Sequence, residues 1–239
     1  SRERDKGYRL RVHQGLVSIQ ATCCPIAEAV EADQEFATVN PRDGSGVERF
    51  QARDLFDLIV TSAWQCGDPG LVFLDAIERA NPTPELGRLE ATNPCGEQPL
   101  LPFESCTLGS INLSRLVTDD SLDWEELDRL GKMGITFLDD VIDRSHYPLP
   151  QISAIVRANR KVGLGVMGLA DMFIKLNIAY DSAEALELAE KIMTRIGAAA
   201  VDQSQALAQK RGPFPNFQRS RYFKEGQPPR RHATVTTVA

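Results

Sequence analysis

Apolar residues recur at helical spacing in three long stretches of the chain. The first stretch predicts a helix over residues 52–66, with Gly67 as its stop. The second predicts a helix that begins after Asp123 and ends before Pro148. Asp123 can cap this helix, and Glu126 stands where a capping box requires an acidic partner.

The third stretch predicts a helix from Ser182, as its N-cap, to about Lys210, before the Gly212-Pro213 terminator. In all three helices the apolar residues are expected to face inward. They are Leu55, Leu58, Ile59 and Ala63 in the first helix; Leu127, Leu130, Phe137, Leu138, Val141 and Ile142 in the second; and Leu186, Ala189, Met193, Ile196 and Ala200 in the third.

Short apolar runs between these helices predict strands. Residues 162–167 indicate a short strand that feeds a helix over residues 169–176, and residues 72–74 a buried strand or turn. The β-branched residues 234–239 predict a strand with no turn behind it, so we expect an incomplete chain whose strand pairs further on. Residues 1–27 show neither period. Helices with interspersed strands indicate an α/β protein.

Composition narrows the class of protein without changing this picture. The chain has 239 residues, of which 42% are apolar and 25% charged, an ordinary globular balance. Its net charge of −6 argues against a nucleic-acid polymer as a partner. No apolar run approaches the roughly 20 residues that cross a bilayer, and the N-terminus lacks the apolar core of a secretory signal, so we expect neither a membrane protein nor a secreted one. Five cysteines are an odd number, so we expect a cytoplasmic protein without a disulfide scaffold.

Two patterns invite a binding role, and neither is specific. Gly163-x-Gly165-x-x-Gly168 fits the dinucleotide-binding pattern, but residues 152–157 before it are not clearly a strand. Close packing of a strand against a helix is therefore the preferred interpretation of these glycines. Metal binding is also disfavoured, because Cys23-Cys24 are too close together for ordinary zinc spacing. The histidines lie far apart, at His13, His146 and His232.

The segment Asn93-Pro94-Cys95-Gly96-Glu97 combines chemically active side chains. Pro94 biases Asn93 away from helical geometry and donates no backbone hydrogen bond, so we expect an extended loop. In an extended backbone alternate residues point the same way, so Asn93, Cys95 and Glu97 are expected to project together. Gly96 allows a ligand or another chain to approach closely. The alternative interpretation is a buried structural cysteine in a polar loop.

The carboxylate beside Cys95 favours radical chemistry over polar attack. A nearby negative charge disfavours a thiolate, and no histidine lies close in the sequence to act as its base. A thiol that exchanges hydrogen atoms needs no ionisation. In such a reaction Glu97 can serve as the base toward a substrate hydroxyl, and Asn93 can hold a second polar group.

The residues around this segment resemble the active-site loop of ribonucleotide reductases. The likeness is an uninterrupted fourteen-residue string from Asn93 to Cys106, continued in Leu108-Gly109-Ser110-Ile111-Asn112-Leu113. The sequence Asn-Pro-Cys-Gly-Glu-Gln resembles that of the adenosylcobalamin-dependent, class II enzymes of this family, whose cofactor contains cobalt. The resemblance covers residues 28–239, as a partial catalytic barrel domain, and leaves residues 1–27 unmatched. Supporting stretches are Trp64 with Gly67-Asp68-Pro69-Gly70, Asn81-Pro82-Thr83-Pro84, residues 160–168 and residues 233–237.

The resemblance implies a role for each candidate residue. Cys95 resembles the cysteine that becomes a thiyl radical and removes the 3′ hydrogen of the ribose, and Glu97 resembles the base that takes the 3′-hydroxyl proton. Asn93 resembles the residue that hydrogen-bonds substrate hydroxyls. Cys106 resembles one half of the redox pair that reduces C2′ and ends as a disulfide. The implied reaction turns ribonucleotides into 2′-deoxyribonucleotides, with a thioredoxin-type reductant as partner and room for a homodimer.

The resemblance also implies a fold, a ten-stranded α/β barrel of two five-stranded halves with the reactive cysteine on a finger loop. The glycine triad then belongs to the barrel scaffold. Some features depart from the family pattern: the second redox cysteine and the substrate-phosphate loop are not matched, and Cys66, Cys23 and Cys24 are not substitutes. His232 stands where asparagine is expected, and Thr107 where asparagine is common. We expect the 239-residue chain alone to be inactive.

Two other functions stay open from the sequence. Another thiyl-radical barrel enzyme, of the glycyl-radical kind, also presents a reactive cysteine on a barrel loop. A non-catalytic helical interaction fragment would carry its cysteines incidentally. Within the reductases, the sequence leaves open a metal-centre class with a separate radical-generating subunit, and a diphosphate or a triphosphate as substrate.

Overall fold

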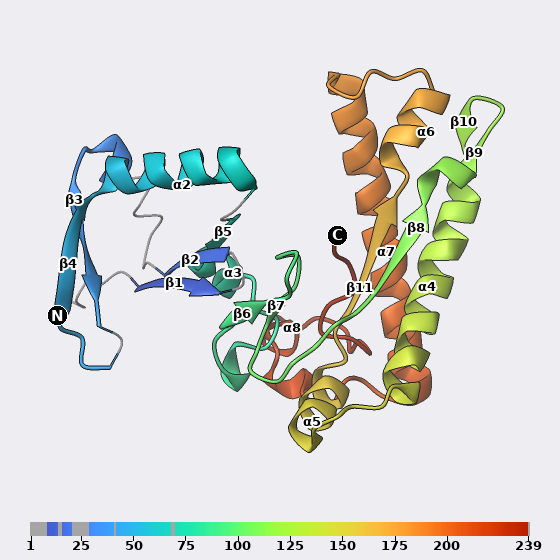
Figure 1. The fold of residues 1–239 in the computed structure, drawn as a ribbon. Helices are drawn as coiled ribbons and strands as arrows, with labels where there is room; N and C mark the ends of the chain where they lie inside the picture. Colours follow the sequence, from blue (N-terminus) through green and yellow to red (C-terminus); the bar gives the residue numbers. More distant parts are fainter. Residues whose placement is uncertain (1–8, 14–15, 21–28, 41, 68–69, 239) are drawn as a thin grey trace. The chain divides into compact units, whose positions relative to one another are not determined.

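The chain forms two compact units, residues 1–81 and residues 82–239. The computed structural model describes residues 9–13, 16–20, 29–40, 42–67 and 70–238 (Figure 1). Cys23 and Cys24, whose spacing disfavours a zinc site, lie outside the described residues.

The first unit combines short strands with helices. Its elements are β1 (Arg9–His13), β2 (Leu16–Gln20), β3 (Glu35–Val39), β4 (Gly46–Gln51), α2 (Ala52–Cys66), β5 (Gly70–Phe73) and α3 (Leu74–Arg79). β1 pairs antiparallel with β2, which pairs parallel with β5, and β3 and β4 form an antiparallel hairpin. The predicted helix over residues 52–66 is confirmed as α2, and Gly67 ends it in the left-handed region at φ 81°.

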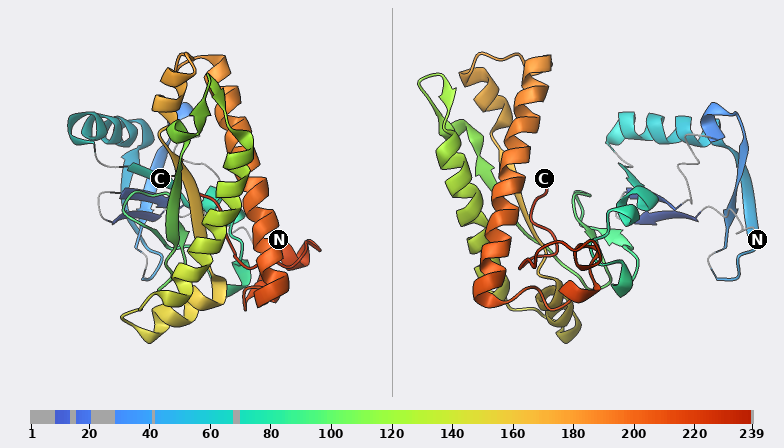
Figure 2. Two further views of the ribbon diagram at one scale, coloured as in Figure 1. Left: turned by 90° about the vertical axis from the view of Figure 1, so that its right-hand side faces the viewer. Right: turned by 180° about the vertical axis from the view of Figure 1, so that it is seen from behind.

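The second unit is built on a parallel pair of strands, β8 (Thr107–Asn112) and β11 (Val162–Met167). The long helices α4 (Trp124–Arg144) and α7 (Ala183–Arg211) pack against each other and run beside this pair, as both views of Figure 2 show. The other elements are η1 (Pro84–Leu86), β6 (Ala91–Thr92), β7 (Pro99–Leu100), η2 (Leu113–Leu116), β9 (Val117–Thr118), β10 (Ser121–Leu122), α5 (Pro150–Asn159), α6 (Leu169–Lys175), η3 (Phe217–Arg219) and α8 (Arg221–Lys224). The predicted α/β class is confirmed.

The predicted helix starts in the second unit are confirmed by their caps. The Asp123 carboxylate accepts a hydrogen bond from the backbone N–H of Glu126, at 2.9 Å, and starts α4. The Ser182 hydroxyl accepts one from the N–H of Ala185, at 3.1 Å, and starts α7. The predicted strand over residues 162–167 is confirmed as β11.

The helix faces expected to point inward are only partly buried. Ile59, Leu138 and Ile196 are buried as predicted, but Leu58, Phe137 and Leu186 are 61%, 66% and 71% exposed. Successive residues of a helix lie about 100° apart, so a narrow contact face buries only one of two neighbouring apolar residues. Ile59 and Leu138 are the buried members of their pairs, and Ala185 takes the inward position beside Leu186.

The C-terminal segment, residues 234–238, lies along the edge of β11 that faces away from β8. The backbone N–H of Leu164 donates to the carbonyl of Val235 at 2.9 Å, and Leu164 and Thr236 form an isolated parallel bridge. Of the strand predicted over residues 234–239, the described residues 234–238 form a short segment with one bridge to β11. The close packing of a strand against a helix that was expected at these glycines is corrected, because the near neighbours of Gly163 and Gly165 are Gln98, β8 and the C-terminal segment.

Glycines in β11 permit this approach. A Cβ atom on Gly165 would lie 2.6 Å from the carbonyl oxygen of Thr237. A Cβ atom on Gly163 would lie 2.7 Å from side-chain atoms of both Leu108 and Thr237. Real Cβ atoms do not come so close to other heavy atoms, so the three-way packing of β8, β11 and the C-terminal segment depends on glycine here.

No helix among the described residues is long and apolar enough to span a bilayer.

Candidate active site

The segment that carries Cys95 is the tip of a β-hairpin. β6 and β7 pair antiparallel, with Thr92 opposite Pro99. A tight turn follows, in which the N–H of Gly96 donates to the carbonyl of Asn93 at 3.0 Å and Gly96 has a φ of 86°. The prediction of an extended loop is therefore wrong. Pro94 stands at the second position of a turn, where its fixed φ is favoured, and Gly96 supplies a left-handed residue, so these residues specify a tight turn.

The three candidate side chains have different environments in this hairpin. The Asn93 side-chain oxygen accepts a hydrogen bond from the N–H of Gln98 at 3.0 Å and so closes the loop. Cys95 is a free, exposed thiol at the turn, so the alternative of a buried structural cysteine is excluded. Glu97 is half-buried. The prediction that Asn93, Cys95 and Glu97 project to the same side assumed an extended backbone. Residues 93–96 form a turn, so that prediction loses its basis.

Glu97 carries an unsatisfied carboxylate oxygen. Its Oε2 atom is buried and has no hydrogen-bond partner among the described residues. Its backbone carbonyl accepts a hydrogen bond from the Thr237 hydroxyl at 3.1 Å, which ties the hairpin to the C-terminal segment. A buried acceptor without a donor costs free energy unless a ligand supplies the missing hydrogen bond.

Cys106 lies directly before β8, and the strand register determines its neighbours. Thr107 lies opposite Val162 in the parallel pair, and the N–H of Thr107 donates to the carbonyl of Lys161 at 3.3 Å. Cys106 and Lys161, each one residue earlier, are therefore adjacent across the pair. Burial raises the pKa of the Cys106 thiol to about 12; Lys161 opposes the rise, and the charges of Glu104 and Glu97 add to it.

A buried ion pair fixes the segment between the hairpin and Cys106. The Lys161 ammonium donates to Glu104 at 2.6 Å, and their side chains are 1% and 0% exposed. The Glu104 carboxylate also accepts hydrogen bonds from the Asn159 side chain at 2.6 Å and from the N–H of Leu101 at 2.9 Å. Lys161 also donates to the carbonyl of Pro99, at 3.4 Å. The pair therefore joins the ends of α5 and β11 to the hairpin.

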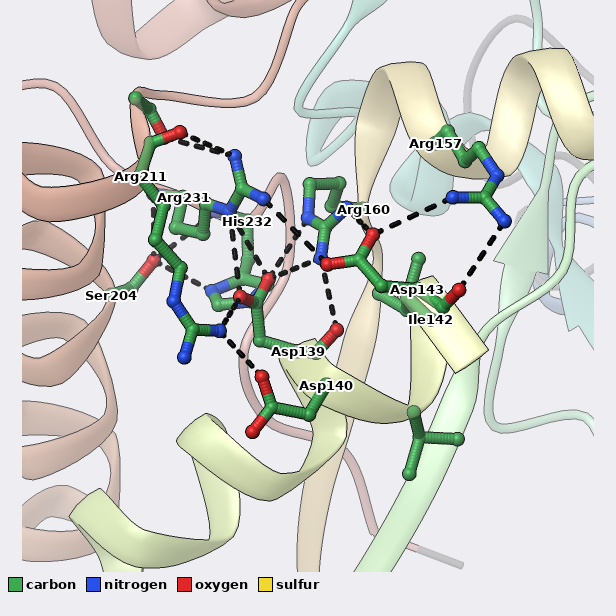
Figure 3. A network of polar contacts seen from close by, with 12 residues as sticks. Asp139, Asp140, Ile142, Asp143, Arg157, Arg160, Ser204, Arg211, Arg231 and His232 are labelled. Carbon is green, nitrogen blue, oxygen red and sulfur yellow. Dashed lines mark hydrogen bonds and ion pairs between the residues drawn. The ribbon is translucent and has the colours of Figure 1, made fainter. Parts of the chain in front are cut away.

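A second buried cluster, centred on Asp139 of α4, holds the C-terminal segment (Figure 3). The Asp139 carboxylate receives hydrogen bonds from Arg160 at 2.6 Å, Arg211 at 2.7 Å, Arg231 at 3.2 Å and His232 at 3.0 Å. Although burial opposes ionisation, the hydrogen bonds from His232 and Arg160 hold the pKa of Asp139 well below its usual range.

His232 is the inner member of this cluster. It is fully buried, and its ring nitrogens contact the Ser204 hydroxyl at 2.9 Å and Asp139 at 3.0 Å. Burial lowers the pKa of the imidazole despite the Asp139 carboxylate. Arg231 and His232 immediately precede the residues that contact β11, so the cluster sets the position from which Thr234 and Thr237 reach Cys106 and Glu97.

The structure brings together Glu97 and Cys106, with the hairpin that carries Asn93 and Cys95. Sequence reasoning missed Glu104, Lys161 and Thr237. One signal for Lys161 was available, because a lysine directly before a buried strand, with no turn residue between them, has to be buried and paired. Among the described residues no group of three or more His, Cys, Asp or Glu side chains could hold a metal ion.

Comparison with known proteins identifies a matching family. The sequence profile of the family described as "Ribonucleotide reductase, barrel domain" matches residues 16–234. The predicted domain boundary at residue 28 stays a prediction.

Similar curated proteins carry the same name in two distant organisms. The chain is 54% identical over 211 residues to the vitamin B12-dependent ribonucleoside-diphosphate reductase of Mycobacterium tuberculosis, covering 88% of this chain and 30% of that protein. It is 49% identical over 213 residues to the protein of that name from Thermoplasma acidophilum, covering 89% of this chain and 28% of that protein. The ribonucleoside-diphosphate reductase large subunit of Trypanosoma brucei is 36% identical over 185 residues, covering 75% of this chain and 22% of that protein. The chain thus spans less than a third of the length of these relatives.

Proposed function

Because this chain belongs to the ribonucleotide reductase family and matches its barrel domain, we propose that it forms part of the active site that reduces ribonucleotides to 2′-deoxyribonucleotides. The observation that carries the proposal is the grouping of the exposed Cys95, the unsatisfied Glu97 carboxylate and the protonated Cys106 thiol on and behind one hairpin. The names of the relatives favour a ribonucleoside diphosphate as the substrate.

Cys95 is the residue that exchanges a hydrogen atom with the substrate. Its thiol lies exposed at a turn, where both a radical source and a ribose can reach it. As a thiyl radical it takes the hydrogen from C3′ of the ribose, and the S–H bond that forms allows the atom to be returned after reduction. Neither step requires an ionised thiol.

Glu97 is the base in the proposed mechanism. Its buried Oε2 atom lacks a hydrogen-bond donor among the described residues, and a substrate 3′-hydroxyl is a donor of the required kind. When that proton moves to Glu97, the C3′ radical gains electron density that helps the 2′-hydroxyl to leave. It leaves as water after it takes a proton from one thiol of the redox pair. Asn93 supports the turn through its side-chain oxygen, and in our proposal its amide group contacts a second hydroxyl of the ribose.

Cys106 supplies reducing equivalents at C2′. Its pKa of about 12 keeps the sulfur protonated at neutral pH, so the thiol has a hydrogen to give. The proposed product on the protein is a disulfide between Cys106 and a second cysteine, which a thioredoxin-type dithiol then reduces. A reaction that needs reduced thiols suits the cytoplasm. We include a homodimer among the expected assemblies, and sedimentation of the complete gene product tests it.

Adenosylcobalamin is the proposed cofactor, in keeping with the names of the relatives. When bound, it supplies the carbon-centred radical that removes a hydrogen atom from a thiol. The residues at the hairpin fit this use, because the Cys95 thiol is free and exposed and so is within reach of a bulky group. The fit concerns Cys95 alone, and we assign no residue to the corrin ring.

Replacing Cys95 by serine tests the proposal. We expect C95S, in the complete gene product supplied with adenosylcobalamin, a dithiol and a ribonucleoside diphosphate, to form no deoxyribonucleotide, because a hydroxyl O–H bond is too strong for this hydrogen exchange. Product is measured by chromatography of the nucleotides. The matched control is C66S on α2, which we expect to keep wild-type turnover.

Unchanged product formation by C95S would contradict the proposal and leave the non-catalytic interpretation standing. The other alternative, an enzyme of the glycyl-radical kind, gains no support, because the matching profile and the named relatives are ribonucleotide reductases.

A further inference from the structure

Lys161 is a fully buried cation that the proposed mechanism does not use. Its side chain is 1% exposed, and a buried ammonium is costly unless its charge is balanced. Glu104 balances it at 2.6 Å. An apolar pair of similar size could hold the loop at lower cost, so the presence of charges here invites a chemical explanation.

The register of β8 and β11 places this ammonium beside Cys106. Val162 lies opposite Thr107 in the parallel pair. Lys161 and Cys106, which directly precede β11 and β8, therefore lie next to each other, with their side chains on the same face. Glu104 lies two residues before Cys106, and Glu97 and Thr234 face the sulfur from the hairpin and the C-terminal segment. Among the described residues whose charges act on the sulfur, Lys161 is the cation, and its effect opposes that of the Glu104 and Glu97 carboxylates.

Reduction of a disulfide at Cys106 requires the sulfur of Cys106 to ionise, and burial of this sulfur disfavours its ionisation. Burial keeps the sulfur protonated, which suits the delivery of hydrogen to C2′. In thiol–disulfide exchange, however, the sulfur that is released leaves as a thiolate, and its departure is faster when the thiolate is stabilised. Two carboxylates near the sulfur hinder that step, whereas an adjacent ammonium assists it.

We propose that Lys161 is a positioning residue that, held by Glu104, supplies the positive charge against which the Cys106 sulfur ionises when its disulfide is reduced by an external dithiol. This rests on the proposed function, which makes Cys106 one half of a redox pair. A thiolate of the dithiol attacks the sulfur of the second cysteine, the S–S bond breaks, and Cys106 leaves with the electron pair and then takes a proton. The second thiol of the dithiol closes a disulfide in the reductant and releases the second cysteine as a thiolate.

The test compares two charge-removing variants of the complete gene product, in the reduced state and without substrate. The rate at which iodoacetamide alkylates Cys106 between pH 7 and 10 is measured by mass spectrometry of peptides, relative to the exposed Cys66 in the same sample. K161M is expected to slow the relative alkylation of Cys106 about tenfold. Loss of the neighbouring positive charge raises the pKa of the thiol, so a smaller fraction of it is ionised at a given pH. E104Q is expected to accelerate it severalfold. The matched control, K210M, removes a charge at the exposed end of α7 and is expected to change nothing.

Opposite changes in the two variants support the proposal, because a merely structural pair would, when broken from either side, loosen the loop and accelerate alkylation in both. Any other combination in folded variants overturns it. If circular dichroism shows that K161M does not fold, E104Q decides. Faster alkylation with unaltered amide hydrogen exchange over residues 99–106 then supports the proposal, and every other result overturns it. Alkylation requires no turnover, so failure of this test and failure of the C95S test are separate outcomes.

Discussion

At the scale of single residues, His232 shows how a side chain that departs from an expected pattern is accommodated. The family resemblance led us to expect asparagine at this position. In the structure the imidazole lies between Ser204 and Asp139, and each of its two ring nitrogens contacts one of these residues. An asparagine at this position would have a shorter side chain. Sequence alone identified the departure. It could not identify the partners, because they lie on α7 and α4, 28 and 93 residues earlier in the chain.

His232 is expected to make stability depend on pH. Burial lowers the pKa of the imidazole in the fold, whereas in the unfolded chain it takes a proton near its ordinary value of 6.5. The unfolded state therefore binds more protons below about pH 6.5, and the free energy of unfolding falls as the pH drops through that value.

The variant H232N is expected to lose this part of the pH dependence, and to be less stable at pH 7.5 by about 1–3 kcal/mol through loss of a buried hydrogen bond. Urea unfolding at pH 7.5 and 5.5 measures both effects. If the difference in stability between the two pH values were the same in H232N as in the parent protein, the assignment to His232 would be wrong.

At the scale of elements, local sequence signals predicted where helices and strands begin and end, but they did not predict which side chains are buried. The bounds of α2 and β11 and the caps of α4 and α7 follow from nearby residues, and the structure has them as predicted. The hairpin at Asn93–Gly96 was missed because Pro94 was interpreted as favouring an extended chain, although a proline followed two residues later by glycine also specifies a turn. The Glu104–Lys161 pair could not be foreseen, because it depends on the parallel register of β8 and β11.

Gly165 is expected to be essential for the packing of the C-terminal segment on β11. In G165A the new Cβ atom would lie 2.6 Å from the backbone oxygen of Thr237, which cannot move away as a flexible side chain can. We expect a loss of about 1–3 kcal/mol in the free energy of unfolding. Urea denaturation measures the loss, and amide exchange of Thr237 reports whether the segment has separated from Leu164.

The matched control is G197A within α7. A Cβ atom there meets nothing within 4 Å, and alanine is the better helix former, so we expect a gain of about 0.5–1 kcal/mol. A G165A variant as stable as the parent would show that the close approach is not needed.

At the scale of the whole molecule, the described residues of the two units differ in the number of apolar side chains that they bury. Residues 82–239 bury a large apolar cluster that joins β8, β11, α4, α6 and α7, whereas the buried apolar side chains in the described part of the first unit are few. The latter are Ala29, Ala52, Ile59 and Val72. Composition predicted a globular protein but could not divide it, because both units share ordinary proportions of apolar residues.

The size of the core in the second unit predicts how this unit behaves alone. We expect residues 82–239, expressed without the first unit, to keep the circular dichroism of α4 and α7 and to unfold in one cooperative step. A thermal scan of this fragment checks the expectation. A gradual, non-cooperative melt of residues 82–239 would count against the division.

The parallel ladder also fixes the chain length near the sulfur. Side chains alternate between the two sides of a strand, so one residue inserted between Cys106 and Thr107 would turn the thiol away from the ammonium of Lys161. An insertion at Asp119-Asp120, in the turn between β9 and β10, would leave that spacing untouched. We therefore expect members of the family to vary in loop length at the second place and to keep a constant count of residues at the first.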